Sequence, residues 1–139
     1  MDTIQVDIVS AEGEIFSGPA SMVFLPASEG EIGVAPRHAP LLTLLKAGEV
    51  RVRTPGGEEQ SFFVGGGALE VQPSKVTVLA DTAARAKDLD EAAAQAARQR
   101  AEEALSGQVD KLTQAEAMAE LARAVAQLKM IEKLRKLRR

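Results

Sequence analysis

The residue types that perform chemistry are few and scattered along this chain of 139 residues. Its one histidine, His38, stands between Arg37 and Ala39 with no nucleophile, orienting acid or second metal ligand close to it in the sequence. It is therefore a poor general base or metal ligand. The chain has no cysteine, which excludes disulfides, thiolate metal sites and cysteine nucleophiles. These observations predict a protein without catalytic residues, metal or cofactor.

Two other features could suggest binding chemistry. Residues 65–67 are three consecutive glycines, but a phosphate-binding loop also needs a Gly-Lys-Ser/Thr ending and a following helix, and neither is present. A turn or bulge in a sheet is the expected role. The remaining carboxylates in turns, Glu29, Glu31, Glu58 and Glu59, have no neighbour in sequence that would perturb them, so we expect them to be solvated.

The charge is unevenly distributed. Residues 1–80 hold ten acids and five bases, whereas residues 81–139 hold ten acids and twelve bases. The last eleven residues carry six bases and one acid. This basic tail could bind anionic lipid, nucleic acid or an acidic protein surface, or remain solvated. The lack of Trp and Phe near it argues against lipid insertion, and the acidic first part argues against nucleic acid.

The first part of the chain has the two-residue period of β-strands. Short runs rich in Val, Leu and Phe occupy residues 4–9, 22–25, 41–45, 50–53, 61–64, 69–71 and 75–79, separated by Gly and Pro. Many short strands at near-regular spacing predict an N-terminal antiparallel β-sandwich, or flattened barrel. We assign it to residues 1–84.

Residues 85–139 predict a C-terminal antiparallel two-helix hairpin, because they are rich in Ala, Glu, Gln, Arg and Leu, contain no proline, and have one glycine, Gly107. We expect a break at Ser106 and Gly107, with Asp88 and Thr113 as the residues that cap the two helices. The expected contact face joins Leu89, Ala92, Ala93, Ala96, Ala97 and Leu105 to Met118, Leu121, Val125, Leu128, Ile131 and Leu134.

Alanine side chains bury little area, so this contact should be weak, while each helix could persist alone because alanine is the best helix former. The pattern is compatible with a stable hairpin or with one that changes its packing without melting. The N-terminus lacks the basic start and apolar run of a secretion signal. No segment approaches the roughly 20 apolar residues that span a bilayer, so we expect membrane association to depend on a partner.

Residues 28–42 read Ser-Glu-Gly-Glu-Ile-Gly-Val-Ala-Pro-Arg-His-Ala-Pro-Leu-Leu. This segment resembles one that is characteristic of the epsilon subunit of bacterial F-type ATP synthases. Residues 7–12, 69–73 and 76–83 also resemble that family, in the same order and spacing, so the similarity covers nearly the whole chain. It implies a β-sandwich followed by a two-helix hairpin, in a non-catalytic rotor subunit of the central stalk.

The resemblance also implies partners and contact residues. Ser10, His38 and Thr43 fall where the family's sandwich meets the gamma subunit, and the turn of Glu29, Gly30 and Glu31 falls where it meets the c-subunit ring. The subunit would couple the alpha/beta catalytic head to the c ring of a proton-translocating ATP synthase. It would be peripheral, on the cytoplasmic face of the bacterial plasma membrane, without inserting into the membrane or binding nucleic acid.

In the family, the C-terminal helices can leave the compact hairpin, extend along gamma and block ATP hydrolysis in the catalytic head. For this chain we expect the inhibitory contacts with acidic segments of the beta subunits to come from Arg123, Lys129, Lys133, Arg135 and Lys136. The alternative is a free-standing binding module whose basic helical arm binds an acidic or membrane surface.

Some relatives bind ATP in the compact hairpin through a motif of Ile or Leu, Asp, two variable residues, Arg and Ala. Here the motif is degenerate, with Leu89, Asp90, Ala93 and Ala94 at its fixed positions. Ala93 replaces the arginine, whose fixed charge and fork of donors would hold the nucleotide. We therefore expect weak or no ATP binding.

Overall fold

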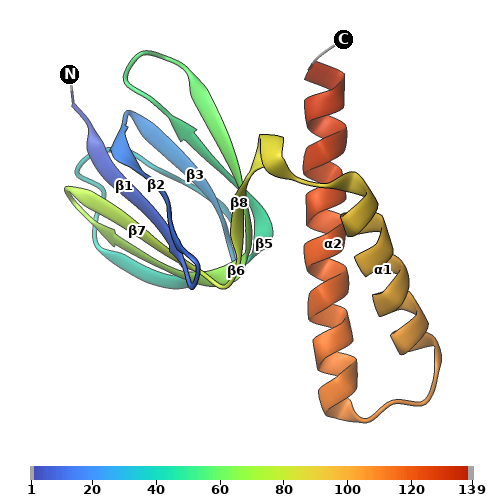
Figure 1. Ribbon diagram of the computed structural model, residues 1–139. Coiled ribbons are helices and arrows are strands. Elements are labelled where there is room, and N and C mark those ends of the chain that lie inside the picture. The colour runs from blue at the N-terminus through green and yellow to red at the C-terminus, as the bar shows by residue number, and fades with distance from the viewer. Residues whose placement is uncertain (1, 138–139) are drawn as a thin grey trace. The chain divides into compact units, whose positions relative to one another are not determined.

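The computed structural model describes residues 2–137, which form an N-terminal sheet-rich unit and a C-terminal helical unit, with the boundary in the sequence between Arg85 and Ala86. The sheet-rich unit has eight strands (Figure 1): β1 Ile4–Ser10, β2 Gly13–Ala20, β3 Met22–Ala27, β4 Gly30–Val34, β5 Leu41–Arg53, β6 Glu59–Gln72, β7 Lys75–Ala80 and β8 Ala83–Arg85. A 3₁₀ turn, Ala86–Asp88, leads to α1 Glu91–Ser106 and α2 Lys111–Leu137. The predicted class, a β-sandwich followed by a helical hairpin, is confirmed.

The strands lie in the order β2-β1-β7-β6-β5-β3-β4, with β8 paired to β6. The pairs are antiparallel with one exception, since β1 pairs with β7 in parallel. Sequence reasoning missed β2, β4 and β8. Strand β2 contains Gly18 and Pro19, which normally mark turns, but β2 is an edge strand, where a proline removes no ladder hydrogen bond.

The two longest strands correct the prediction in another way. Residues 41–45 and 50–53 belong to one strand, β5, and residues 61–64 and 69–71 belong to another, β6. Gly48 and residues 65–67 therefore lie within strands and do not form connecting turns. The C-terminal part of β6 pairs with β7 and its N-terminal part with β8. Gly65 and Gly66 lie between these two sets of partners, and Gly66 has a φ of 101°, which glycine adopts readily.

The core lies between the two layers of the sandwich. Alternate residues of β1, Ile4, Val6 and Ile8, are fully buried, as the two-residue period predicted. They join one cluster with side chains from the other strands, among them Leu25, Phe62 and Val78. Burying a large apolar side chain stabilises a fold by about 1.5–3 kcal/mol, so this cluster holds the sandwich together.

Asp7 of β1 forms contacts that depend on pH. Hydrogen bonds from the Gln5 amide and the Ser17 hydroxyl, together with the Lys75 ammonium 3.1 Å away, hold the pKa of Asp7 below its ordinary value of 3.8. The resulting stability is present above that ordinary value and is lost as the pH falls through the folded pKa. We expect Asp7→Asn to cost about 1 kcal/mol at pH 7 and progressively less as the pH falls through the folded pKa. Urea unfolding over a series of pH values below 7 measures the change, and a loss that is the same at every pH would contradict it.

The helical unit begins with caps other than those predicted. Helix α1 is capped by Asp90, which accepts a hydrogen bond of 3.1 Å from the Ala93 N–H, and not by Asp88, which lies in the 3₁₀ turn. At the start of α2 the Asp110 carboxylate accepts from the Thr113 N–H at 2.7 Å. That bond lowers the pKa of Asp110. The predicted break at Ser106 and Gly107 is present.

The contact between the helices is rich in alanine, but the predicted face was partly wrong. Ala94 and Ala101 of α1 are buried, as are Ala117 and Ala124 of α2, and each pair is spaced by seven residues. The expected contact residues Ala92, Ala93, Ala96 and Met118 are exposed. One reason is that Asp90 starts α1 two residues later than predicted. The other is that most of the predicted contact residues of α1 are alanine, so composition did not reveal which of these residues face α2. Leu121, Leu128, Ile131 and Leu134 are half-buried, as expected for contact residues.

Candidate functional site

The described residues contain no arrangement typical of catalysis. Within residues 2–137 no polar or charged side chain is buried, and no three potential metal ligands lie together. The Nδ1 atom of His38 lies 2.7 Å from the carbonyl oxygen of Ala39, and its backbone N–H donates to Ala35. His38 therefore helps order its own loop. The candidate sites are surfaces that could bind other proteins.

The sandwich exposes a band of apolar side chains on its outer face. Leu42 and Leu44 of β5 are 75% and 66% exposed, and Leu79 of β7 is 56% exposed. Strand register aligns Leu44, Ala68, Leu79 and Val9 in one row across β5, β6, β7 and β1. We call Leu42 and this row the apolar band. Exposed apolar clusters of this kind mark protein-binding surfaces.

The structure does not bring the three expected gamma-contact residues into one cluster. Ser10 follows Val9 at the end of β1, where its Oγ accepts a hydrogen bond from the Glu12 N–H. Thr43 pairs with the buried Leu69, so its side chain is on the core side of β5. His38 lies at the other end of the sheet, because the neighbouring Arg37 N–H donates to Pro73 in the β6–β7 turn.

Sequence reasoning missed the outward leucines on either side of Thr43. The signal was available: residues 41–45 read Leu-Leu-Thr-Leu-Leu, with leucine at both odd and even positions. A strand that is apolar on both faces is buried on both faces or has an outer face that binds a partner. Leu79 could not be assigned in the same way, since it joins Leu44 only through the strand register.

The predicted c-ring residues form the hairpin between β3 and β4. The connection is Ser28 and Glu29, and Gly30, with a φ of 136°, is the first residue of β4. The Ser28 N–H donates to the carbonyl oxygen of Leu44, so this acidic hairpin adjoins the apolar band. The Glu31 carboxylate is 2.9 Å from the Arg51 guanidinium.

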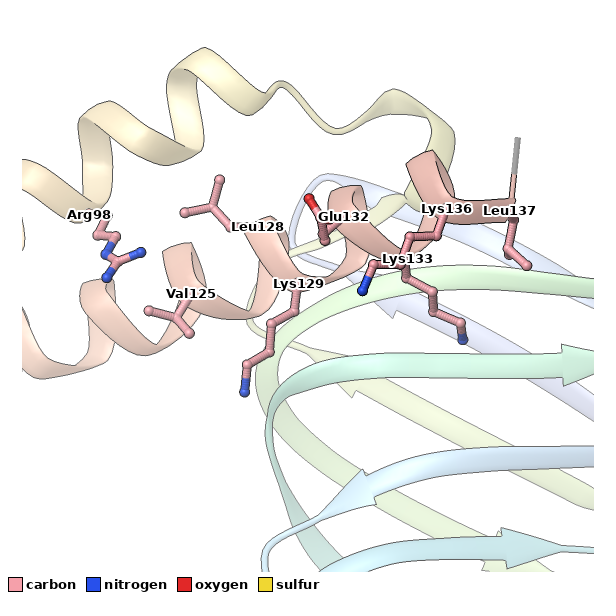
Figure 2. A pocket seen from close by; sticks show the side chains of 8 residues that line it. All are labelled: Arg98, Val125, Leu128, Lys129, Glu132, Lys133, Lys136 and Leu137. Carbon is pink, nitrogen blue, oxygen red and sulfur yellow. The ribbon is translucent and has the colours of Figure 1, made fainter. Parts of the chain in front are cut away.

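A groove of about 590 Å³ is lined by side chains of the helical unit (Figure 2), four of them basic, three apolar and one acidic. Its lining residues are Arg98, Val125, Leu128, Lys129, Glu132, Lys133, Lys136 and Leu137. Three of the five predicted inhibitory residues, Lys129, Lys133 and Lys136, therefore share one face. Arg138 and Arg139, the last bases of the predicted tail, lie outside the described residues.

The other two expected inhibitory residues lie elsewhere on α2. Arg123 is half-buried, and Arg135 forms ion pairs with Glu91 of α1 and with Glu132. A second ion pair between the helices joins Arg100 to Glu120 at 3.4 Å. Pairs as exposed as these contribute only about 0–1 kcal/mol each. These ion pairs therefore add little to the stability of the hairpin.

The degenerate nucleotide motif has structural roles in the helical unit. Asp90 caps α1, Ala94 is buried between the helices, and Leu89 is half-buried. Ala93 is exposed and offers no donor beyond its backbone N–H, which Asp90 already occupies. None of the described helices is long and apolar enough to cross a membrane.

Comparison with known proteins gives consistent matches to one family. The family described as ATP synthase, Delta/Epsilon chain, beta-sandwich domain matches residues 3–86, and its long alpha-helix domain matches residues 87–132. The ATP synthase epsilon chain of Nitrosococcus oceani is 63% identical, covering 96% of each chain. That of Halorhodospira halophila is 60% identical, covering 98% of this chain and 97% of the relative.

Solved structures show the same fold at low sequence identity. A chain in the Euglena gracilis mitochondrial ATP synthase (OSCP/F1/c-ring) is 20% identical, covers all of this chain and 83% of its own length, and has a TM-score of 0.70. A chain in the central stalk/c-ring structure of the Tetrahymena thermophila enzyme has a TM-score of 0.63 at 14% identity. From the family matches and the close relatives, the chain belongs to the ATP synthase delta/epsilon chain family, a non-catalytic subunit of that complex.

Proposed function

We propose that this subunit joins the catalytic head of a proton-translocating ATP synthase to its c ring and restrains ATP hydrolysis through its C-terminal helices. The coupling role is supported by one observation: the apolar band lies beside the acidic β3–β4 hairpin. Two adjoining surfaces of different chemistry suit a subunit that binds two partners at once. The subunit would be peripheral, on the cytoplasmic face of a bacterial plasma membrane.

The apolar band is the proposed contact with gamma. Leu42, Leu44 and Leu79 present exposed side chains, and burying them against a partner releases their hydration water. Ser10, His38 and Thr43 are assigned to this contact by resemblance alone: Ser10 would border the band, whereas His38 lies at the other end of the sheet and Thr43 on the core side of β5. The Glu29, Gly30 and Glu31 hairpin would bind the polar loops of the c ring, where a carboxylate needs hydrogen-bond donors.

The helical unit supports the proposed inhibition through its weak inner contact and basic outer face. Buried alanines and exposed ion pairs give the compact hairpin little stability. When the helices separate, Arg135 loses Glu91 and becomes able to bind an acidic surface. Arg123, Lys129, Lys133, Arg135 and Lys136 would then pair with acidic segments of the beta subunits, and these contacts offset the lost ones.

The test is ATP hydrolysis by a purified cognate catalytic head that lacks its own epsilon chain. We expect the full-length chain to lower the rate at saturation, and a chain truncated after Lys87 to bind the head without inhibiting it. Binding of both without inhibition would leave only the coupling role. Failure of both to bind would contradict the proposed partners.

We also expect the hairpin to bind ATP weakly, because Ala93 replaces the arginine of the nucleotide motif and Asp90 is occupied as a cap. Calorimetry on the full-length chain should give a dissociation constant above the micromolar range. Ala93→Arg should tighten binding by about tenfold, since it restores a charge-assisted contact. Tighter than micromolar binding by the unaltered chain would contradict this expectation.

A further inference from the structure

Strands β4, β3 and β5 hold Arg51 in a defined place beside Glu31. Strand register aligns Gly33, Phe24 and Arg51 in one row across the three strands. The Arg51 guanidinium lies over the Phe24 ring, 4.5 Å from its centroid. A planar guanidinium stacks well on an aromatic face. The Arg51 side chain is only 23% exposed, so this stacking leaves it little freedom.

Gly33 makes this arrangement possible. A Cβ at Gly33 would lie 2.8 Å from the Met22 methyl and 3.2 Å from the Phe24 ring. With glycine there, the ring of Phe24 can pack close to β4 on the outer face. Arg53 also lies over the same ring, at 5.4 Å, but its ion pair is with Glu59.

From this position Arg51 reaches Glu31 across an intervening strand. Arg51 is on β5 and Glu31 is on β4, with β3 between them. The Arg51 Nη2 donates to Glu31 Oε1 at 2.9 Å. Glu31 is otherwise solvent-exposed, and among residues 2–137 no hydrogen bond to its Oε2 is found. One carboxylate oxygen is therefore held, while 57% of the Glu31 side chain remains exposed.

We propose that Arg51, stacked on Phe24, is a positioning residue that fixes the Glu31 carboxylate for the c ring. This inference rests on the proposed function of Glu31. A carboxylate already held in place loses less side-chain entropy on binding than a mobile one, so its partner binds more tightly. Lysine cannot replace Arg51, because an ammonium neither stacks flat on Phe24 nor presents a fork of donors.

The experiment measures binding of full-length variants to a purified subassembly of gamma and the c ring. We expect Glu31→Gln to weaken binding roughly tenfold, and Arg51→Ala and Arg51→Lys to weaken it roughly threefold to tenfold. The double variant Arg51→Ala with Glu31→Gln should bind no more weakly than Glu31→Gln alone. Arg53→Ala is the matched control, since it removes a guanidinium from the same ring without touching Glu31, and it should bind normally.

Measurements on the variants without their partners distinguish a loss of Glu31 positioning from damage to the fold. The Glu31 ¹³Cδ resonance should move in Arg51→Ala and stay in place in Arg53→Ala, with all melting temperatures within a few degrees. If Glu31→Gln weakens binding while Arg51→Ala does not, or if the two losses add in the double variant, the positioning role is wrong. If Glu31→Gln binds normally, the proposed c-ring contact of Glu31 is wrong, and the role of Arg51 is wrong with it.

Discussion

Replacing Leu44 and Leu79 together by aspartate is expected to lower the affinity of the sandwich for gamma by at least about 100-fold. Both side chains are more than half exposed in the same row of the apolar band. Burial at the centre of an interface makes such residues contribute about 2 kcal/mol or more each, and a buried carboxylate without a partner adds a further cost. Titration of isolated gamma with the full-length variant measures the loss.

A control variant shows whether the loss of affinity for gamma is specific to the apolar band. Leu112 of α2 is 71% exposed, so Leu112→Asp makes the same chemical change in the helical unit. We expect it to leave gamma binding unchanged. The melting temperature of the double variant should also stay within a few degrees, because neither leucine belongs to the core. Normal gamma binding by the double variant would mean that the partner docks elsewhere.

Gly67→Ala is expected to destabilise the sandwich by roughly 3 kcal/mol or more. Gly67 has a φ of 138°, and an added Cβ would lie 2.1 Å from the carbonyl oxygen of Leu79, a backbone atom of the neighbouring strand. The new methyl group therefore combines backbone strain with a contact that only separation of β6 and β7 can relieve. Thermal unfolding should show a fall of at least about 10 °C in the melting temperature.

Substitutions at two other glycines separate the two causes of the Gly67→Ala destabilisation, which are backbone strain and steric contact. Gly57 has a φ of 89° with no atom within 4 Å of the added Cβ, and Gly56 has open space around it without a positive φ. Gly57→Ala should cost about 1 kcal/mol from backbone strain alone, and Gly56→Ala close to nothing. If Gly67→Ala costs no more than Gly57→Ala, the strands relax around the methyl group and the steric argument is wrong.

Local periodicity was sufficient to predict an element wherever the residues on each face of a strand or helix have the same surroundings along its length. The alternation of Ile4, Val6 and Ile8 predicted β1, and the change of composition after residue 80 predicted the helices, because side-chain direction within a strand or a helix follows from its own repeat. For residues 65–67 these signals left a turn or a bulge as the expected role, and the structure has all three glycines inside β6. The signals failed at the start of α1, where Asp88 was predicted as the cap and Asp90 is the cap.

The sequence by itself determined the fold class, the break at Gly107, the family and the basic character of the last helix, since all of these depend on local pattern or on similarity along the chain. Only the tertiary structure decided which residues lie together. The row of Leu44, Ala68, Leu79 and Val9 comes from four strands, and the pair of Arg51 and Glu31 spans a third strand between them. Strand order and register depend on the packing of the whole core, so no local pattern encodes these contacts.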